Sequence, residues 1–237
     1  MKMFVQEFQR RVAEIEKYFD LVDKIEQLGT LGSVSASSIT FPSGEYTVDS
    51  QLQKILKSHC YLLLYNLIES SIRNGITAIH DAICLEQLTY KELSPKIQRL
   101  WVLNDLSKSF RDAYIKKETV ADNLQEALKV VLDDEVVALE PTNIPISGNL
   151  NAETIKNLIE MYGFFGNLGV PKSDIDNVLD VVVKVRCDLA HGNVSFSDAS
   201  EQIVWSKLVD DKDKIVIYLT HLLQNIEEYV DQKKYKI

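Results

Sequence analysis

Apolar residues recur at steps of three and four along most of this chain, the spacing that places them on one face of an α-helix. In the first stretch they begin at Phe4 and end near Leu28, and in the second they begin after Asp49. The pattern predicts helices over residues 4–28, 49–88, 95–115 and 119–137.

The same spacing continues through the second half of the chain. Asn149 or Asn151 is suited to cap a helix that ends between Gly163 and Gly166, because Asn is a preferred N-cap residue. Ser173 and Asp176 give a capping signal for a helix that Gly192 ends. A last helical segment is predicted from about residue 195 to 235, with a solvated turn or kink at the charged run 210–214.

Residues 29–48 interrupt the helical pattern with Ser, Gly, Thr and one proline. Within them, the stretches 39–41 and 46–48 have the composition of two short strands around the turn at 42–45, so a small hairpin is expected. The fold class predicted is all-α, a helical bundle with an N-terminal helix and this hairpin insertion. We expect residues 1–48 to pack on a main domain of residues 49–237.

Composition places the chain among ordinary globular proteins, since 46% of its 237 residues are hydrophobic and 26% are charged. The N-terminus reaches acidic residues before any continuous apolar run, and no stretch approaches the roughly 20 apolar residues of a membrane span. A cytoplasmic location without membrane contact is therefore expected. Three widely spaced cysteines predict free thiols, with neither a disulfide framework nor a metal site.

The net charge of −9 argues against nonspecific nucleic-acid binding, which normally needs a basic surface. A negative net charge is still compatible with a local basic groove, and it also suits binding to a basic protein partner. The motifs of zinc proteases, P-loop nucleotide hydrolases, dinucleotide-binding domains and serine hydrolases are absent from the sequence.

The strongest candidate for chemistry is the segment 186–192, RCDLAHG, at the end of the predicted helix. Arg186 carries a fork of donors that suits phosphate oxygens, and His191 has the side chain whose ordinary pKa lies nearest neutrality. A step of five residues turns about 140° around a helix, so the two side chains are not neighbours on one face. Gly192 is expected to release His191 from the helical direction.

The longer sequence RCDLAHGNVSF, residues 186–196, resembles the R-x-x-L-A-H-G-x-x-S-F segment of HEPN-superfamily proteins encoded in bacterial toxin–antitoxin and antiviral defence loci. The segment 147–151 before a helix and the helix around 64–69 fit the same branch, and the resemblance spans about residues 50–232. It implies a homodimer whose two Arg–His segments meet in one cleft, and a metal-independent, cofactor-free RNA endonuclease. The catalytic residues of this endonuclease would be Arg186 and His191. The protein would act as a toxin or defence effector.

The resemblance departs from its pattern in one position, because Cys187 follows the arginine where family members commonly carry Asn or Asp. The orienting hydrogen bond is then lost or rerouted, with Asp188 or Asn193 as substitutes, and Glu69 or Arg73 is a further candidate to orient the guanidinium or the imidazole. The alternative function is a noncatalytic HEPN-like module that binds a nucleotide or a protein partner, such as an antitoxin or a defence-complex subunit.

Overall fold

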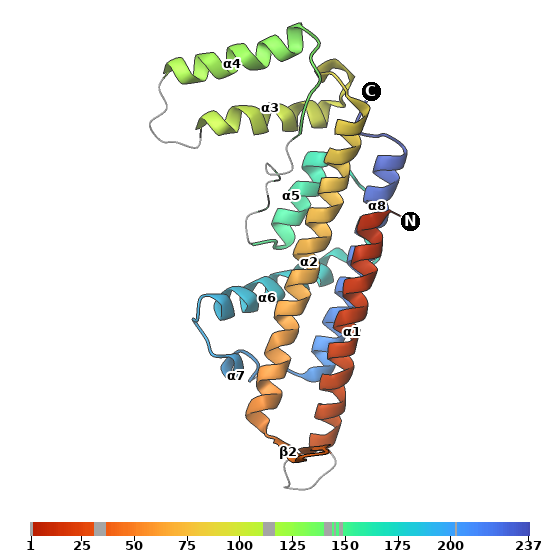
Figure 1. Cartoon of the computed structure of the whole chain (residues 1–237), viewed down its shortest axis with the longest axis vertical. Helices are drawn as coiled ribbons and strands as arrows, with labels where there is room; N and C mark the ends of the chain where they lie inside the picture. The colour runs from red at the N-terminus through yellow and green to blue at the C-terminus, as the bar shows by residue number, and fades with distance from the viewer. Residues whose placement is uncertain are drawn as a thin grey trace. The chain divides into compact units, whose positions relative to one another are not determined.

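The structure, a computed structural model, describes residues 2–30, 37–110, 117–139, 144, 146, 149–201 and 203–237. Helices dominate these residues in Figure 1, and the strands among them form one two-stranded antiparallel sheet. The predicted all-α class is confirmed. The helices are α1 (Met3–Thr30), α2 (Ser50–Glu86), the 3-10 turn η1 (Tyr90–Glu92), α3 (Pro95–Phe110), α4 (Lys117–Leu132), α5 (Ala152–Tyr162), α6 (Lys172–Ala190), α7 (Phe196–Ala199) and α8 (Trp205–Asp231).

The hairpin predicted after the first helix is confirmed. Strand β1 (Ser37–Phe41) pairs with β2 (Gly44–Val48), and Ile39 lies opposite Tyr46. Gly44 has a φ of +135°, a conformation that side chains rarely adopt, so the tight turn requires glycine at this position. The predicted end of a helix at Ile115 and most of the connection 139–145 lie outside the described residues.

Two compact units divide the chain, and the continuous helices α2 and α8 contribute residues to both. The first unit comprises residues 1–71, 148–153 and 168–220, and the second comprises 72–147, 154–167 and 221–237. The boundary predicted at residue 48 therefore concerns the first unit only, and it stays a prediction.

Helices α1, α2, α6 and α8 supply the core of the first unit. Val22, Leu64 and Val182 are fully buried there, as the helical spacing of apolar residues predicts. Polar atoms fix the long helices at their edges, because the Trp205 indole donates a hydrogen bond of 2.7 Å to Asp23, and the Tyr18 hydroxyl donates one of 3.1 Å to the Leu56 carbonyl.

The turn predicted at residues 210–214 is wrong, because α8 runs through this charged stretch without interruption. Asp211 and Lys212 are buried, with exposed fractions of 5% and 6%. The helix survives because these charges are paired: Lys207 bonds Asp211, and the Lys212 ammonium lies 2.6 Å from a Glu16 oxygen. Paired charges bury their alkyl stems against apolar surface, which a reading of composition alone does not reveal.

In the second unit, α2 and α8 approach each other closely at Gly75. A Cβ at this position would lie 2.7 Å from Ile226 Cδ1, so the glycine permits the contact. The chain end is fixed in the same unit, because Glu86 accepts hydrogen bonds from the Tyr235 hydroxyl and the Lys236 ammonium and pairs with Lys233. These contacts lower the pKa of Glu86 to about 2, the Lys233 hydrogen bond being the largest cause.

Candidate active site at the end of helix α6

Helix α6 ends beside the candidate residues Arg186 and His191, and its end forms a defined backbone motif. Gly192 has a φ of +69°, its amide donates to the Leu189 carbonyl at 3.2 Å, and the Asn193 amide donates to the Asp188 carbonyl at 2.9 Å. These two bonds and the left-handed glycine make up a Schellman motif, so the predicted stop at Gly192 is confirmed. The predicted cap at the other end is wrong, because Pro171 occupies the N-cap and Ser173 bonds Asp174 within the first turn.

His191 occupies the C-cap of α6 and is exposed to solvent. Its backbone stays in the right-handed helical region, with φ −90° and ψ −1°, and its amide donates to the Cys187 carbonyl at 3.0 Å. The expectation that Gly192 releases His191 from the helix is therefore not met. Within one chain, Arg186 and His191 start from directions about 140° apart around α6.

Arg186 is half-buried, and its guanidinium lies over the ring of Tyr65 on α2, 4.4 Å from the ring centre. A guanidinium on an aromatic face is attracted by the ring electrons and loses little of its donor capacity, because the donors point outward in the guanidinium plane. Tyr65 itself is 3% exposed, so it offers a fixed platform. The stack on Tyr65 and the contact with the Cys187 sulfur hold the Arg186 side chain in place.

The Tyr65 platform has its own supports. Its hydroxyl forms hydrogen bonds with the Glu69 carboxylate and with the backbone of Leu150. Burial raises the pKa of Tyr65, the Glu69 charge adds to the rise, and the Leu150 bond and the Arg186 charge oppose it. Glu69 thus contacts the tyrosine on which Arg186 lies, and its suggested role in orienting the guanidinium stays a prediction.

Cys187 takes part in the same arrangement through Asn149. Its thiol donates a hydrogen bond of 3.1 Å to the Asn149 side-chain oxygen, and its sulfur accepts one of 3.9 Å from an Arg186 guanidinium nitrogen. The polar contact expected after the arginine is therefore directed to the segment that precedes α5. Three stretches far apart in sequence, around Tyr65, Asn149 and Arg186, meet here.

Asp188 and Asn193 form a hydrogen-bonded pair of their own at the end of α6. The Asn193 side-chain amide donates a hydrogen bond of 3.3 Å to the Asp188 carboxylate, beside the backbone hydrogen bond between the same two residues. The pair therefore stabilises the end of the helix. Arg73 is exposed and belongs to the second unit, so its suggested role stays a prediction.

The loop that follows His191 is tied to α2. Ser195 caps α7, since its hydroxyl accepts a hydrogen bond from the Asp198 amide. The Phe196 ring stacks on His59 with ring centres 4.7 Å apart, and the Ser58 hydroxyl donates to the Phe196 carbonyl. These contacts anchor the chain shortly after His191, which leaves the imidazole itself at the surface.

A separate pocket of about 550 Å³ in the first unit is lined by the first half of α6 and by α8, and it includes neither Arg186 nor His191. The pocket therefore belongs to a different part of α6 from the Arg186–His191 pair. Within the described part of the chain, no cluster of three or more His, Cys, Asp or Glu side chains is arranged to hold a metal ion. No described helix has the length and apolar character to cross a membrane.

Sequence reasoning missed Tyr65 and Asn149 as site residues, although both lie in segments whose resemblance was recognised. One signal was available, because Tyr65 and Glu69 are four residues apart and therefore share a helix face. No signal in the sequence pairs either residue with the end of α6.

Comparison with protein families gives a match to the HEPN_MAE_28990-like HEPN model over residues 2–235. The match covers nearly the whole chain, and it includes the first helix and the hairpin as well as the Arg–His segment. Comparison with curated proteins gives no match, and neither does comparison with solved structures.

Proposed function

This chain belongs to the HEPN_MAE_28990-like HEPN family, and from that membership and the site we propose that it is a metal-independent RNA endonuclease, a toxin or defence effector. Arg186 and His191 are the proposed catalytic residues. The proposal extends to a homodimer, in which two copies supply one composite cleft.

The observation that carries the proposal is the placement of Arg186 on Tyr65, 4.4 Å from the ring centre, beside a helix end where His191 is exposed. Stacking on the buried Tyr65 ring holds the Arg186 guanidinium at the helix end, and a guanidinium carries the planar set of N–H donors that suits phosphate oxygens. An exposed imidazole within the same turn-and-a-half of helix supplies a proton carrier.

The chemistry proposed uses a nucleophile that RNA already contains. The ribose 2′-oxygen attacks the adjacent phosphorus, a 2′-O–P bond forms, and the P–O5′ bond breaks. One His191 takes the 2′-hydroxyl proton as general base, and a second His191 gives a proton to the departing 5′-oxygen. Arg186 stabilises the charge that builds on the phosphate oxygens. The products are a 2′,3′-cyclic phosphate and a 5′-hydroxyl.

The proposed chemistry requires a dimer, because the general base and the general acid are His191 side chains of two different copies. In a single chain the helical conformation of His191 keeps it about 140° around α6 from Arg186. Two copies related by a two-fold axis bring two arginines and two imidazoles together, as an isologous interface does for any pair of equivalent residues. Partly apolar exposed positions on α6, such as Val181 at 44%, are suited to such a contact.

The test is cleavage of an RNA oligonucleotide by the purified full chain in the presence of EDTA. We expect a 2′,3′-cyclic phosphate end, identified by mass spectrometry, and no cleavage when the nucleotide before the cut carries a 2′-deoxyribose. His191→Ala and Arg186→Ala each reduce the rate about 100- to 1000-fold, the range for removing one transition-state contact. His221→Ala, a histidine on α8, serves as the matched control and keeps full activity.

Cleavage that survives in His191→Ala, or that continues on the 2′-deoxy substrate, contradicts the proposed chemistry. Wild-type protein that is dimeric and folded but leaves every RNA tested intact contradicts the enzyme assignment itself.

The alternative function is a noncatalytic HEPN module that binds a protein partner or a nucleotide. Two observations support it. Position 187, where family members commonly carry a polar residue, is a cysteine whose thiol bonds Asn149, and the net charge of the chain is −9. In that case wild type and His191→Ala are equally harmless when expressed in cells, whereas a nuclease arrests growth only as wild type.

A further inference from the structure

The short helix α7 presents an aromatic ring at the surface of the first unit. Phe196 is 36% exposed, whereas Phe19 and Tyr61 of the same unit are 4% exposed each. The Phe196 ring stacks on His59 of α2, with the ring centres 4.7 Å apart and the planes within 16° of parallel. A parallel stack covers one face of a ring, so the exposed part of Phe196 belongs to its edge and its other face.

Contacts with α2 hold this ring in a fixed position. The Nδ1 atom of His59 lies 2.8 Å from a carbonyl oxygen one turn earlier in α2. The Ser58 hydroxyl donates a hydrogen bond to the Phe196 carbonyl. Further along the loop, the Ser200 hydroxyl donates one of 2.7 Å to the Lys54 carbonyl. A ring that is already fixed can bind a ligand without the cost of ordering its own side chain.

Phe196 lies close in the chain to the proposed catalytic histidine. It follows His191 by five residues, so their Cα atoms are at most about 18 Å apart. A stacked nucleic-acid strand rises about 3.4 Å per nucleotide, so about five nucleotides span that distance at most. Between the two residues, Gly192, Asn193 and Ser195 are exposed, and a Cβ added at Gly192 would meet no atom of the described chain within 4 Å. One short strand can therefore reach both the ring and the imidazole.

The chemistry of an aromatic platform suits the charge of this chain. Binding that depends on neutralised phosphates needs a basic surface, whereas the net charge is −9. Stacking on an aromatic ring uses the flat face of a base instead, and every base has such a face. The bases of a duplex are already stacked on one another, so the ring favours a single strand. The exposed Phe196 ring therefore fits an unpaired base of single-stranded RNA.

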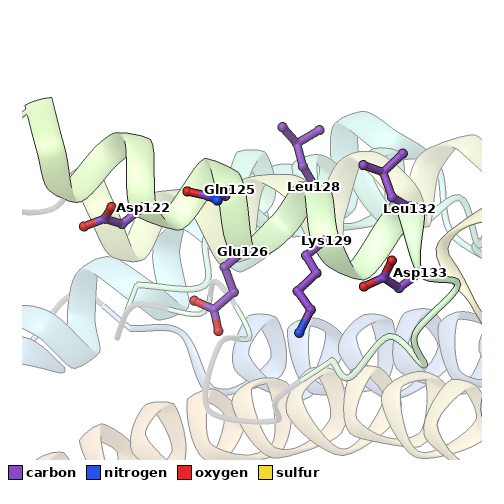
Figure 2. Close-up of a pocket in the computed structure, with 7 residues that line it drawn as sticks. All are labelled: Asp122, Gln125, Glu126, Leu128, Lys129, Leu132 and Asp133. Atoms are coloured by element: carbon purple, nitrogen blue, oxygen red, sulfur yellow. The ribbon is translucent and has the colours of Figure 1, made fainter.

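The pocket on α4 in the second unit has the size for a nucleotide but the wrong charge. It encloses about 590 Å³, a volume that small-molecule pockets commonly have. Asp122, Glu126 and Asp133 line it, and Lys129 is the one cation among its lining residues (Figure 2). A row of carboxylates repels the phosphates of RNA. The Phe196 ring is the better place for an RNA strand, because its contact is with the base.

We propose that Phe196, stacked on His59, is the platform on which one base of a single-stranded RNA substrate stacks, and that this contact holds the strand across His191. The inference rests on the proposed nuclease function and adds how the substrate is held. Phe196 touches the base and takes no part in the proton transfers. It therefore contributes to KM and hardly to kcat, as does any contact of equal strength in the ground state and the transition state.

The test is binding of a fluorescein-labelled RNA of about 12 nucleotides, a length within the site sizes of single-strand binders. Every ribose of this strand is 2′-O-methylated, so no 2′-hydroxyl is left to attack. Fluorescence anisotropy with the purified full chain is expected to show saturable binding. The same strand paired with its complement, and an abasic strand of equal length, are expected to bind at least about tenfold more weakly.

Variants of the protein locate the binding. Phe196→Leu keeps an apolar side chain against His59 but has no aromatic face, and it is expected to weaken binding of the single strand about tenfold. Phe196→Tyr keeps the face and is expected to bind as wild type does. Phe165→Ala is the matched control, because Phe165 is a 58% exposed phenylalanine of the second unit. Circular dichroism melting verifies that each variant is folded.

A second measurement needs no substitution and decides the question if Phe196→Leu does not fold. Ultraviolet crosslinking of an iodouridine-substituted strand to wild type, mapped by mass spectrometry, is expected to modify Phe196. The proposal is overturned by any of these results: no saturable binding to wild type, unchanged affinity in folded Phe196→Leu, equal loss in Phe165→Ala, or a crosslink that maps elsewhere. Equal affinity for the abasic strand or the duplex overturns it as well.

Failure of the proposed nuclease function is recognised separately, because the methylated strand cannot be cut and its binding does not depend on cleavage. Folded wild type that binds the methylated strand and leaves unmodified RNA intact keeps the platform and contradicts the nuclease. Where cleavage occurs, Phe196→Leu is expected to raise KM about tenfold with kcat nearly unchanged, and an unchanged KM contradicts the platform.

Discussion

The end of α6 and the outer face of α4 both present side chains to solvent, but they are built in opposite ways. At α6, Arg186 lies on the buried ring of Tyr65, which is held in turn by Glu69 and Leu150. At α4, Leu128 and Leu132 have no described packing partner that buries them. The guanidinium is thus fixed by contacts from other segments, whereas the exposed α4 leucines are held by little besides their own helix.

The largest expected contrast is in stability. Leu208 on α8 is fully buried, so Leu208→Ala is expected to lower the free energy of unfolding by about 2–5 kcal/mol. Leu132→Ala removes a side chain that is 74% exposed and is expected to change it by less than about 0.5 kcal/mol. Urea unfolding followed by circular dichroism measures both. A large loss in Leu132→Ala means that α4 is packed in solution and contradicts the exposure of its leucines.

The next contrast is functional. His191→Ala is expected to reduce RNA cleavage about 100- to 1000-fold, because it removes one transition-state contact. Leu128→Ala on α4 is expected to leave the rate unchanged, because this exposed side chain lies outside the Arg186–His191 site. Rate measurements on the two variants, prepared in the same way, compare the two regions. Slower cleavage by correctly folded Leu128→Ala contradicts the comparison.

A smaller effect is expected from the platform under Arg186. Tyr65→Ala removes the aromatic face and is expected to slow cleavage about tenfold, while Tyr65→Phe keeps the face and retains nearly full activity. The two variants are compared through kcat and KM, because loss of a positioning contact made in the transition state appears in kcat. Equal loss in both variants assigns the effect to the hydroxyl and its bonds to Glu69 and Leu150, and contradicts the role of the stack.

The smallest expected effect is a pH dependence of stability in the second unit. The pKa of Glu86 is about 2 in the folded chain because of Lys233, Lys236 and Tyr235, and about 4.3 in an unfolded one. Its stabilising contribution is therefore complete above about pH 5 and is lost as the pH falls toward 2. Glu86→Gln lacks this contribution, so the difference in unfolding free energy from wild type is expected to shrink over that window. A difference that stays constant with pH contradicts the assignment.

Helical periodicity determined most of the secondary structure of this protein, because an apolar stripe is a local property of the sequence. The long helix α2, the hairpin and the stop at Gly192 were all predicted from neighbouring residues. The charged run 210–214 was mispredicted as a turn, since the pairing of Lys212 with Glu16 joins residues far apart in the chain. A charge that is paired across helices cannot be told from a solvated one by composition.

The sequence by itself determined the family and the candidate pair Arg186 and His191, because both residues lie in one contiguous sequence motif. Only the tertiary structure decided that Tyr65 carries the guanidinium, that Cys187 bonds Asn149, and that the α4 leucines are left uncovered. Each of these depends on which helix faces which, and that is fixed by the packing of whole apolar faces, which no single segment encodes.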